Sequence, residues 1–521
     1  MASLSSALFE YKYLILCAAA ALLCARLWKG HVQYKIDQQF AAQHGCKPLK
    51  AWKSSWPFGL DLLSKALRYA REERILQFFV ALVAESGTTF EQNLLGARGI
   101  DTVDPQNIET ILSKDFSNYG LGLRSKHFYP LMGSGIFTQE GAEWKHSREL
   151  LRPQFMSNRF QNLEQIKRSV QDLIECIPSS GIVDLQPLFF RLTFDTTTFL
   201  LFGRSMSSLA SEEVAGQESE FADAFNVGQD YLAHFGRLGD FYWVANDREF
   251  RKACDTCHKF VDNAVKKALE DSKRQTTEMA ERKHYVFIDA LIQETQDPKV
   301  LRDQCLNVLL AGRDTTACCL SWTFRLLARH PKVLEKLRSE IESTVGLGKN
   351  APEPSRNDLK KMAYLGIVIK EVLRLYPSVP VNGRAALKTT TLPVGGGEDG
   401  KAPVLVRRGE AVGYSVYVMH RRKDIYGEDA EEFRPERWEG DALKDIGYAY
   451  LPFNGGPRLC LGQDFALLEA SYTIVRILQV FPEIGLSEEE AKVGVGKERQ
   501  ALTLVVASAE GCVVELKPFD G

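Results

Sequence analysis

Apolar and polar positions alternate with helical spacing over most of the first two thirds of this chain. From about Ser64 to Ser343, apolar residues recur every three or four positions between charged ones, for example in residues 162–177 and 250–274. This spacing predicts amphipathic helices. Short apolar runs separated by Gly and Pro, in residues 389–418 and 502–514, predict strands. The pattern therefore predicts a mainly α fold with a small β region.

Two apolar stretches depart from the amphipathic pattern. Residues 304–329 predict a long apolar helix, interrupted by the polar sequence Gly312-Arg313-Asp314-Thr315-Thr316. Gly and a run of Asp and Thr are poor helix-interior residues, so we expect a local defect, either a packing kink or an active-site feature. The second stretch, Tyr13 to Ala25, is an unbroken apolar run near the N-terminus.

That N-terminal run is shorter than the roughly 20 residues of a membrane-spanning helix. Lys12 and Arg26 can extend it by snorkelling to residues 8–28, and the basic residues that follow favour a cytoplasmic C-terminal side. A cleaved signal peptide is the alternative, but Glu10 precedes the run and bulky residues follow it. We expect a retained single-pass anchor in residues 1–35, a linker in 36–60 and a catalytic domain in 61–521.

Composition narrows the possible functions. The chain has 521 residues, enough for two domains or for one large fold around a cofactor. Its 65 basic and 67 acidic residues give a net charge of −2, with no basic excess for nucleic acid, and we expect no nucleic-acid partner. The 11 cysteines show no disulfide-like spacing, which favours a reducing compartment.

The strongest chemical signal is the sequence FNGGPRLCLG at residues 453–462. Cys460 precedes a predicted helix over 461–480, where the positive helix end lowers a thiol pKa. Arg458 can neutralise an anion, Phe453 can shield the sulfur, and the two glycines at 455 and 456 allow close backbone approach. The loop therefore suits a thiolate that holds a haem iron, and the alternative is an inert cysteine beside a turn.

Two helical pairs accompany this loop. Trp144 and Arg148 are four residues apart, so an indole N–H and a guanidinium share one helix face and can bind an anion. Glu371 and Arg374 are three residues apart in an apolar segment, residues 359–375. A buried ion pair needs further partners, and the sequence FRPERW at 433–438 can supply one.

Taken in chain order, these features resemble the cytochrome P-450 superfamily. The resemblance implies the mainly helical fold of that family around haem b, with Cys460 as the axial ligand of the iron. It implies that Arg437 completes a structural triad with Glu371 and Arg374, and that Asp314 and Thr315 carry protons for catalysis. Ala311 stands where families with covalently bound haem have Glu, which argues against covalent attachment. The remaining cofactor-binding residues implied are Trp144, Arg148, Gly312, Arg384, Phe453, Arg458 and Gly462.

The resemblance also implies an activity. The strings around residues 144–148, 311–316 and 451–458 are similar to fungal alkane and fatty-acid hydroxylases of the superfamily. We therefore expect a monooxygenase that hydroxylates a fatty acid or n-alkane at or near its terminal carbon, at the endoplasmic reticulum membrane with the catalytic domain facing the cytosol. No flavin or nicotinamide domain is recognisable, so electrons from NADPH would arrive through NADPH-cytochrome P-450 reductase. The expected substrate pocket is apolar and comprises Leu310, Ala311, Val379, Val381 and Leu502, with Leu309, Pro380 and Leu504 nearby.

Other interpretations stay open at this point. A tailoring hydroxylase of secondary metabolism would use the same machinery. A haem-thiolate isomerase or dehydratase needs no oxygen activation, so Asp314 and Thr315 argue against it. A haem sensor without enzymatic activity is the third alternative. The sequence Cys254-x-x-Cys257-His258 matches a c-type haem motif, but it lies in a charged amphipathic segment and we interpret it as structural.

Overall fold

The fold is mainly helical. The computed structural model describes residues 2–155, 163–179, 181–203, 205–209, 212–274, 286–486 and 488–519. The helices of eight or more residues are α1 Ala2–Gln43, α2 Leu60–Arg71, α3 Ile75–Ser86, α5 Arg124–Met132, α6 Gly141–Leu151, α7 Leu163–Cys176, α8 Leu185–Phe202, α9 Glu212–Leu238, α10 Arg248–Arg274, α11 Phe287–Glu294, α12 Pro298–Arg329, α13 Pro331–Val345, α15 Ala363–Leu375 and α18 Gln463–Val480. The shorter ones are α4 Pro105–Glu109, α14 Arg356–Lys361, α16 Val416–Met419, α17 Lys423–Tyr426 and α19 Glu488–Ala491.

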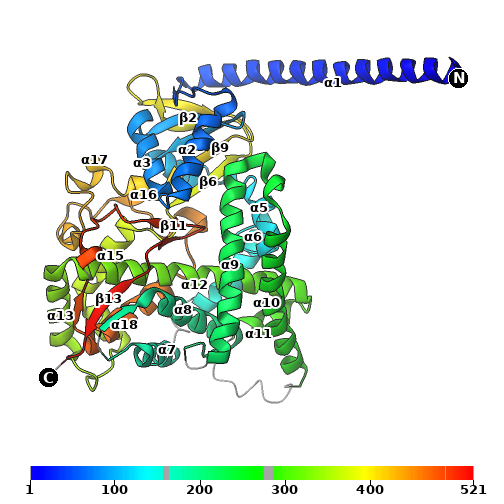
Figure 1. The fold of residues 1–521 in the computed structure, drawn as a ribbon. Helices are drawn as coiled ribbons and strands as arrows, with labels where there is room; N and C mark the ends of the chain where they lie inside the picture. The colour runs from blue at the N-terminus through cyan, green and yellow to red at the C-terminus, as the bar shows by residue number, and fades with distance from the viewer. Residues whose placement is uncertain are drawn as a thin grey trace.

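In the described residues, thirteen strands form four small sheets. They are β1 Lys50–Ala51, β2 Thr89–Leu94, β3 Ala97–Thr102, β4 Tyr119–Gly120, β5 Gly181–Asp184, β6 Val381–Ala386, β7 Thr390–Gly396, β8 Ala402–Val406, β9 Ala411–Ser415, β10 Glu483–Gly485, β11 Gln500–Leu502, β12 Val506–Ser508 and β13 Val513–Lys517. The largest sheet has the order β1-β2-β3-β9-β6-β4 and lies with α2 and α3 near α1 (Figure 1). The strands predicted in 389–418 and 502–514 are confirmed, except that residues 416–419 form α16.

Helix α12 is the central element, and in Figure 1 it crosses the middle of the molecule. The predicted helices 250–274 and 304–329 are confirmed within α10 and α12; residue 162, the predicted start of α7, lies outside the described residues. The prediction of a local defect at residues 311–316 is wrong, because α12 continues through these residues as an uninterrupted α-helix. Instead, residues 309 and 310 belong to one hydrophobic core and residues 317–320 to another, so the polar segment lies where the two cores meet.

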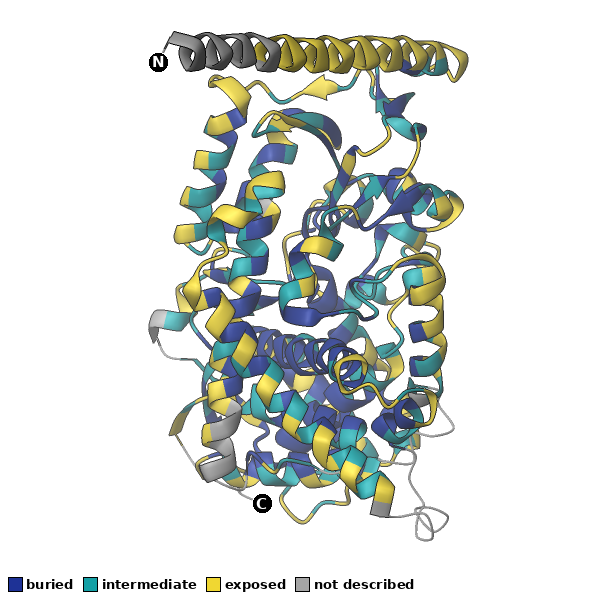
Figure 2. Ribbon diagram, turned by 90° about the vertical axis from the view of Figure 1, so that its right-hand side faces the viewer, coloured by how far each residue is buried: buried dark blue, intermediate teal, exposed yellow. Residues whose placement is uncertain are grey.

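Helix α1 runs from Ala2 to Gln43 and projects from the rest of the molecule (Figure 1). It attaches near its C-terminal end, where buried Asp37 accepts a hydrogen bond from Thr389 Oγ1 over 3.1 Å. In the described residues, no helix combines the length and the apolar character needed to cross a membrane. Figure 2 shows the exposed α1 above a body whose interior is buried. The anchor, linker and domain boundaries stay predictions.

Candidate functional site

Cys460 lies between the short helical turn η9 (Gly456–Arg458) and α18. Its backbone N–H donates to the Phe453 carbonyl over 3.0 Å, which closes the loop. The thiol is exposed, whereas the cysteines of α10 and α12 are buried. The surrounding protein nevertheless desolvates the thiol and raises its pKa. Both observations place the sulfur in a recess of the protein.

Three groups favour the thiolate form of Cys460 against that desolvation. The backbone N–H groups of Gly462 and Gln463 donate to the sulfur, and the positive charge of Arg148 lies close by; each lowers the thiol pKa. A recessed sulfur with donors aimed at it suits a thiolate metal ligand. Substitution of Gly456 would be strained, because its φ is +63° and a Cβ would lie 1.8 Å from the Leu112 carbonyl oxygen.

Four arginines gather beside this loop: Arg124, Arg148, Arg384 and Arg458. In the described part of the chain their hydrogen-bond partners are carbonyl and amide oxygens, such as Gln139 O for Arg458 at 2.8 Å and Gly383 O for Arg384 at 2.8 Å. Desolvation and neighbouring arginines lower the pKa of Arg458 to about 10 and that of Arg124 to about 9. The Nε of Arg384 is buried without a partner.

This concentration of positive charge fits an anionic ligand. Trp144 is buried next to it, with the Arg458 guanidinium 4.4 Å from its ring centroid. Arg148 donates to the Leu459 carbonyl over 2.9 Å, so α6 also contacts the cysteine loop. The carboxylate of Glu140 lies near Arg124 and Arg458, but in the described residues no carboxylate forms a hydrogen bond or an ion pair with the four arginines. A recessed sulfur beside this excess of positive charge is the donor set that a haem with two carboxylates requires, and the residues present therefore fit this cofactor.

The polar segment of α12 presents one open face. Between residues 303 and 327 of this helix, every residue is buried except Ala311, Gly312 and Thr315. These positions share a helix face because they are one and four residues apart. The Thr315 hydroxyl donates to the Ala311 carbonyl over 2.7 Å. Packing against α8 also requires a glycine at position 312, because a Cβ there would lie 2.3 Å from Thr197 Oγ1 of that helix.

Asp314 points elsewhere. It is buried and accepts hydrogen bonds from Arg313 Nη1 over 2.6 Å and from Gln229 Nε2 of α9 over 2.8 Å. The structure thus separates the two predicted catalytic residues: Thr315 lies on the open face and Asp314 is held between α12 and α9. For Asp314 to exchange protons with that face, its contact with Gln229 must rearrange.

The predicted pocket residues come from three segments that hydrogen bonds hold together. Ser378 Oγ donates to the Thr315 carbonyl over 2.9 Å, and Val506 N–H donates to the Ser378 carbonyl over 3.1 Å. Their exposure differs: Val379 is exposed, Ala311, Val381, Leu502 and Leu504 are partly exposed, and Leu309, Leu310 and Pro380 are buried. Leu309 and Leu310 pack in a hydrophobic core, and the predicted pocket stays a prediction.

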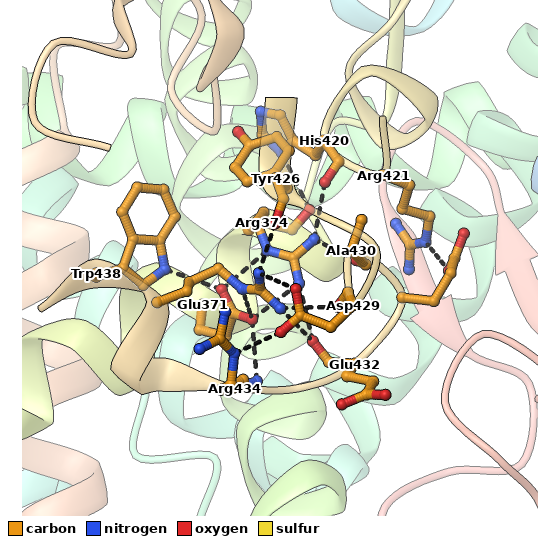
Figure 3. Close-up of polar contacts among 12 residues, drawn as sticks. Glu371, Arg374, His420, Arg421, Tyr426, Asp429, Ala430, Glu432, Arg434 and Trp438 are labelled. Atoms are coloured by element: carbon orange, nitrogen blue, oxygen red, sulfur yellow. Dashed lines mark hydrogen bonds and ion pairs between the residues drawn. The ribbon is translucent and has the colours of Figure 1, made fainter. Parts of the chain in front are cut away.

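Glu371, Arg374 and Arg437 are buried and lie together in one hydrogen-bonded cluster. Figure 3 labels Glu371 and Arg374 among the polar contacts of this region. Both Glu371 oxygens accept from Arg374, over 2.8 and 2.9 Å, and Arg437 Nε donates to Glu371 Oε1 over 2.8 Å. Trp438 Nε1 adds a fourth hydrogen bond of 2.9 Å. The carboxylate is thus saturated, and Arg374 also donates to the His420 and Ala430 carbonyls.

Sequence reasoning missed Arg124 and Gln229, because each lies among other polar residues of its helix and only the fold brings it to the site. It interpreted His420 as structural or solvated and not as a ligand, and the side chain is buried. Cys254 and Cys257 were interpreted as structural, and both are buried in α10, where burial raises the pKa of Cys254 to about 12. His258 Nε2 contacts the Leu131 carbonyl at 2.9 Å. Within the described residues, no group of His, Cys, Asp and Glu side chains could hold a metal ion.

Comparisons with known proteins agree with this geometry. The family model described as cytochrome P-450 matches residues 55–492. The chain is 62% identical over 508 residues to a cytochrome P-450 of Arthroderma benhamiae, covering 97% of this chain and 98% of that protein. It is 43% identical to cytochrome P-450 52A13 of Debaryomyces hansenii, with 90% and 92% covered, and 46% identical to cytochrome P-450 52A5 of Candida maltosa, with 82% and 84% covered.

Proposed function

Because this chain belongs to the cytochrome P-450 family, we propose that it hydroxylates a fatty acid or an n-alkane at or near the terminal carbon. Family membership makes it a monooxygenase, an enzyme that uses haem, O2 and electrons from a reductase. The observation that carries the proposal is the recessed Cys460 thiol beside a cationic cluster that lacks a carboxylate partner among the described residues.

In this proposal the cofactor is haem b. Cys460 would ligate its iron, with Phe453 and Gly462 beside the thiol and Gly312 on the open face of α12. Arg148, Arg384, Arg458 and Trp144 would hold its two carboxylates. Arg124, which the sequence did not reveal, joins them. When bound, a haem with a thiolate ligand activates O2 and inserts one oxygen atom into a C–H bond. Glu371, Arg374 and Arg437 support the loop and take no part in the chemistry.

Thr315 and Asp314 are the proposed proton carriers. The Thr315 hydroxyl can rotate from the Ala311 carbonyl toward the open face, where it holds a water molecule for proton delivery. Asp314 reaches this path only when Gln229 releases it. In Thr315→Ala we expect NADPH to be consumed with hydrogen peroxide replacing much of the product, while thermal stability stays unchanged. Unchanged coupling would place the proton path elsewhere, with Asp314 the next candidate.

The proposed substrate class rests on the resemblance to alkane and fatty-acid hydroxylases and on the apolar lining. Ala311, Val379, Val381 and Leu502 carry open apolar surface in the three segments joined through Ser378. Each buried methylene contributes roughly 0.8 kcal/mol, so affinity should rise steeply with chain length. Terminal attack also needs restricted access, because terminal C–H bonds are the strongest in the chain. Val379 and Leu502 are the proposed constriction.

Membrane association is part of the same proposal. The described residues of α1 expose Leu16, Leu22, Leu23, Leu27 and Trp28. The turn between α9 and α10, which exposes Phe241, Trp243 and Val244, lies on the same side of the molecule as α1 (Figure 1). Aromatic and apolar residues of this kind suit a lipid interface. We propose the endoplasmic reticulum membrane, with the catalytic domain in the cytosol and NADPH-cytochrome P-450 reductase as partner.

Turnover of a chain-length series tests the proposal. Full-length protein, reductase, NADPH and fatty acids or alkanes of increasing length should give terminal or near-terminal alcohols, with an optimum length. Cys460→Ser should abolish turnover and the red-shifted carbonyl band of a thiolate haem. If the series is not turned over but a polycyclic or aromatic compound is, the enzyme is a tailoring hydroxylase. Product formation without NADPH consumption would identify an isomerase or dehydratase.

A further inference from the structure

His420 is a fully buried imidazole at the end of α16. The Leu451 N–H donates to its Nε2 over 2.9 Å, so Nε2 carries no proton. Nδ1 therefore carries the proton and donates to the Arg374 carbonyl, 3.0 Å away. Both nitrogens of a neutral ring are used, and the tautomer is fixed by its two partners.

These two partners belong to different parts of the site. Arg374 is the centre of the Glu371 cluster, and its Nη1 also donates to the His420 carbonyl over 2.8 Å. Leu451 lies two residues before Phe453, whose carbonyl accepts the Cys460 N–H over 3.0 Å. His420 therefore stands between the buried ion-pair cluster and the start of the cysteine loop, as Figure 3 shows for its side facing Arg374.

The ring is also held in place by its neighbours. It stacks on Tyr450 with centroids 5.2 Å apart and an interplanar angle of 22°. Tyr450 in turn donates from its hydroxyl to the Lys370 carbonyl of α15 over 2.9 Å. On another side Tyr426 meets the ring at 70°, and Tyr426 OH donates to the Ala449 carbonyl over 2.8 Å. The contacts of Tyr450 and Ala449 therefore connect the residues just before the cysteine loop to the region around Arg374.

We propose that His420 is a positioning residue that holds the Cys460 loop in the geometry needed for thiolate ligation, by hydrogen bonding it to the Glu371–Arg374–Arg437 cluster. The proposal rests on the proposed function, since it presumes that Cys460 binds haem iron. Loss of the imidazole would leave a buried N–H and a buried C=O unpaired at the two ends of this link. The loop would then loosen before the rest of the fold.

Urea titration of the full-length, haem-loaded protein tests the proposal. The thiolate-type carbonyl band and far-ultraviolet circular dichroism are followed in the same samples. In His420→Phe, we expect the band to convert to the thiol-type form at urea concentrations where the helices stay intact. At one such concentration, the rate of this conversion should be on the order of tenfold higher than in wild type. His420→Gln places an amide between the same two partners and should restore most of the wild-type rate. If His420→Phe does not fold, His420→Asn, which reaches only one partner, should show the same early conversion.

His330→Phe is the matched control. Its ring bonds within its own helix, to the Leu326 carbonyl at 2.8 Å, and packs on Phe433. This variant should lose the band and the helical signal together, as wild type does. Coincident loss in the His420 variants, or a His420→Gln variant no better than His420→Phe or His420→Asn, would overturn the positioning role. A wild-type protein without any thiolate band would instead refute the proposed function and leave no loop geometry to test.

Discussion

Two buried groups of arginines in this molecule use the same side chain in opposite ways. Around Glu371, two guanidiniums share one carboxylate, and the remaining donors reach backbone carbonyls such as those of His420 and Ala430. Around Cys460, the guanidiniums of Arg124, Arg384 and Arg458 reach carbonyl and amide oxygens. Burial and neighbouring arginines lower the pKa of Arg124 and of Arg458.

The difference shows how to distinguish buried arginines that stabilise the fold from buried arginines that bind a ligand. Burying a cation is costly unless an anion compensates it. The first group is compensated within the chain and is therefore complete without a ligand. The arginines of the second group have the carboxylate of Glu140 nearby but form no hydrogen bond or ion pair with a carboxylate in the described part of the chain. We therefore propose that this group binds an anion that comes from outside.

The largest expected effect comes from breaking the compensated group. In Arg437→Leu, Glu371 loses one partner and the Asp429 and Glu432 contacts of Arg437 disappear as well. Removing one member of a buried ion pair costs about 3–5 kcal/mol. We expect little folded protein, and a denaturant midpoint well below that of wild type where some is recovered. A stability close to wild type would show that this cluster is not the support we infer.

The same substitution in the uncompensated group should act on cofactor binding instead. In Arg458→Leu, one unneutralised cation is removed, so the cofactor-free protein should be as stable as wild type or more stable. Cofactor affinity should fall by about tenfold or more, the effect of one charge-assisted hydrogen bond. Haem transfer to apomyoglobin measures the affinity. Arg71→Leu, at an exposed position in the last turn of α2, is the control and should change neither quantity.

Added anions should stabilise the cofactor-free protein through the arginines beside Cys460. A multivalent anion such as pyrophosphate that binds the uncompensated arginines stabilises the folded state by RT ln(1 + [L]/Kd), about 2.7 kcal/mol at one hundred times Kd. We expect the thermal midpoint to rise with pyrophosphate in wild type and Arg71→Leu, and the rise to be lost in Arg458→Leu. Equal rises in all three proteins would mean a general salt effect.

The smallest expected effect is a pH dependence of stability that comes from a second buried glutamate, Glu469. Glu469 of α18 is buried against the Thr196 and Thr316 hydroxyls, and burial raises its pKa from 4.5 to about 8. The folded state therefore holds a proton that the unfolded state releases between pH 4.5 and 8, and the stability it contributes is lost as pH rises through this window. The slope is at most about 1.4 kcal/mol per pH unit.

Glu469→Gln should remove that slope. Burial of His420 acts in the opposite sense, because its pKa falls from 6.5 to about 3 and stability is lost as pH drops below 6.5. The two slopes offset each other between pH 4.5 and 6.5, so the clearest window for the measurement is pH 6.5 to 8. The amide of Glu469→Gln stays uncharged like the protonated carboxyl, so the denaturant midpoint of wild type should fall below that of Glu469→Gln as pH rises across that window. Parallel curves would mean that Glu469 does not titrate there.

Much of this molecule could be predicted from local spacing. The periodicity of residues 250–274 and 304–329 predicted two helices, because amphipathic or wholly apolar runs have few other stable arrangements. The pairs Trp144–Arg148 and Glu371–Arg374 are fixed by helical geometry once the helix forms. The arrangement of Cys460 ahead of a helix follows from the glycines, proline and apolar run around it. These features depend on residues a few positions apart, so the sequence by itself determined them.

Tertiary structure alone decided how distant residues meet. Arg124 joins Arg384 only because α5 lies beside β6, where both arginines contact the Asn382–Gly383 backbone region. Asp314 and Thr315 are neighbours in sequence, yet packing of α9 against α12 turned one toward Gln229 and left the other open. His420 links Arg374, 46 residues before it in the sequence, to Leu451, 31 residues after it. Such contacts depend on the packing of whole elements, which the spacing of residues along a chain does not encode.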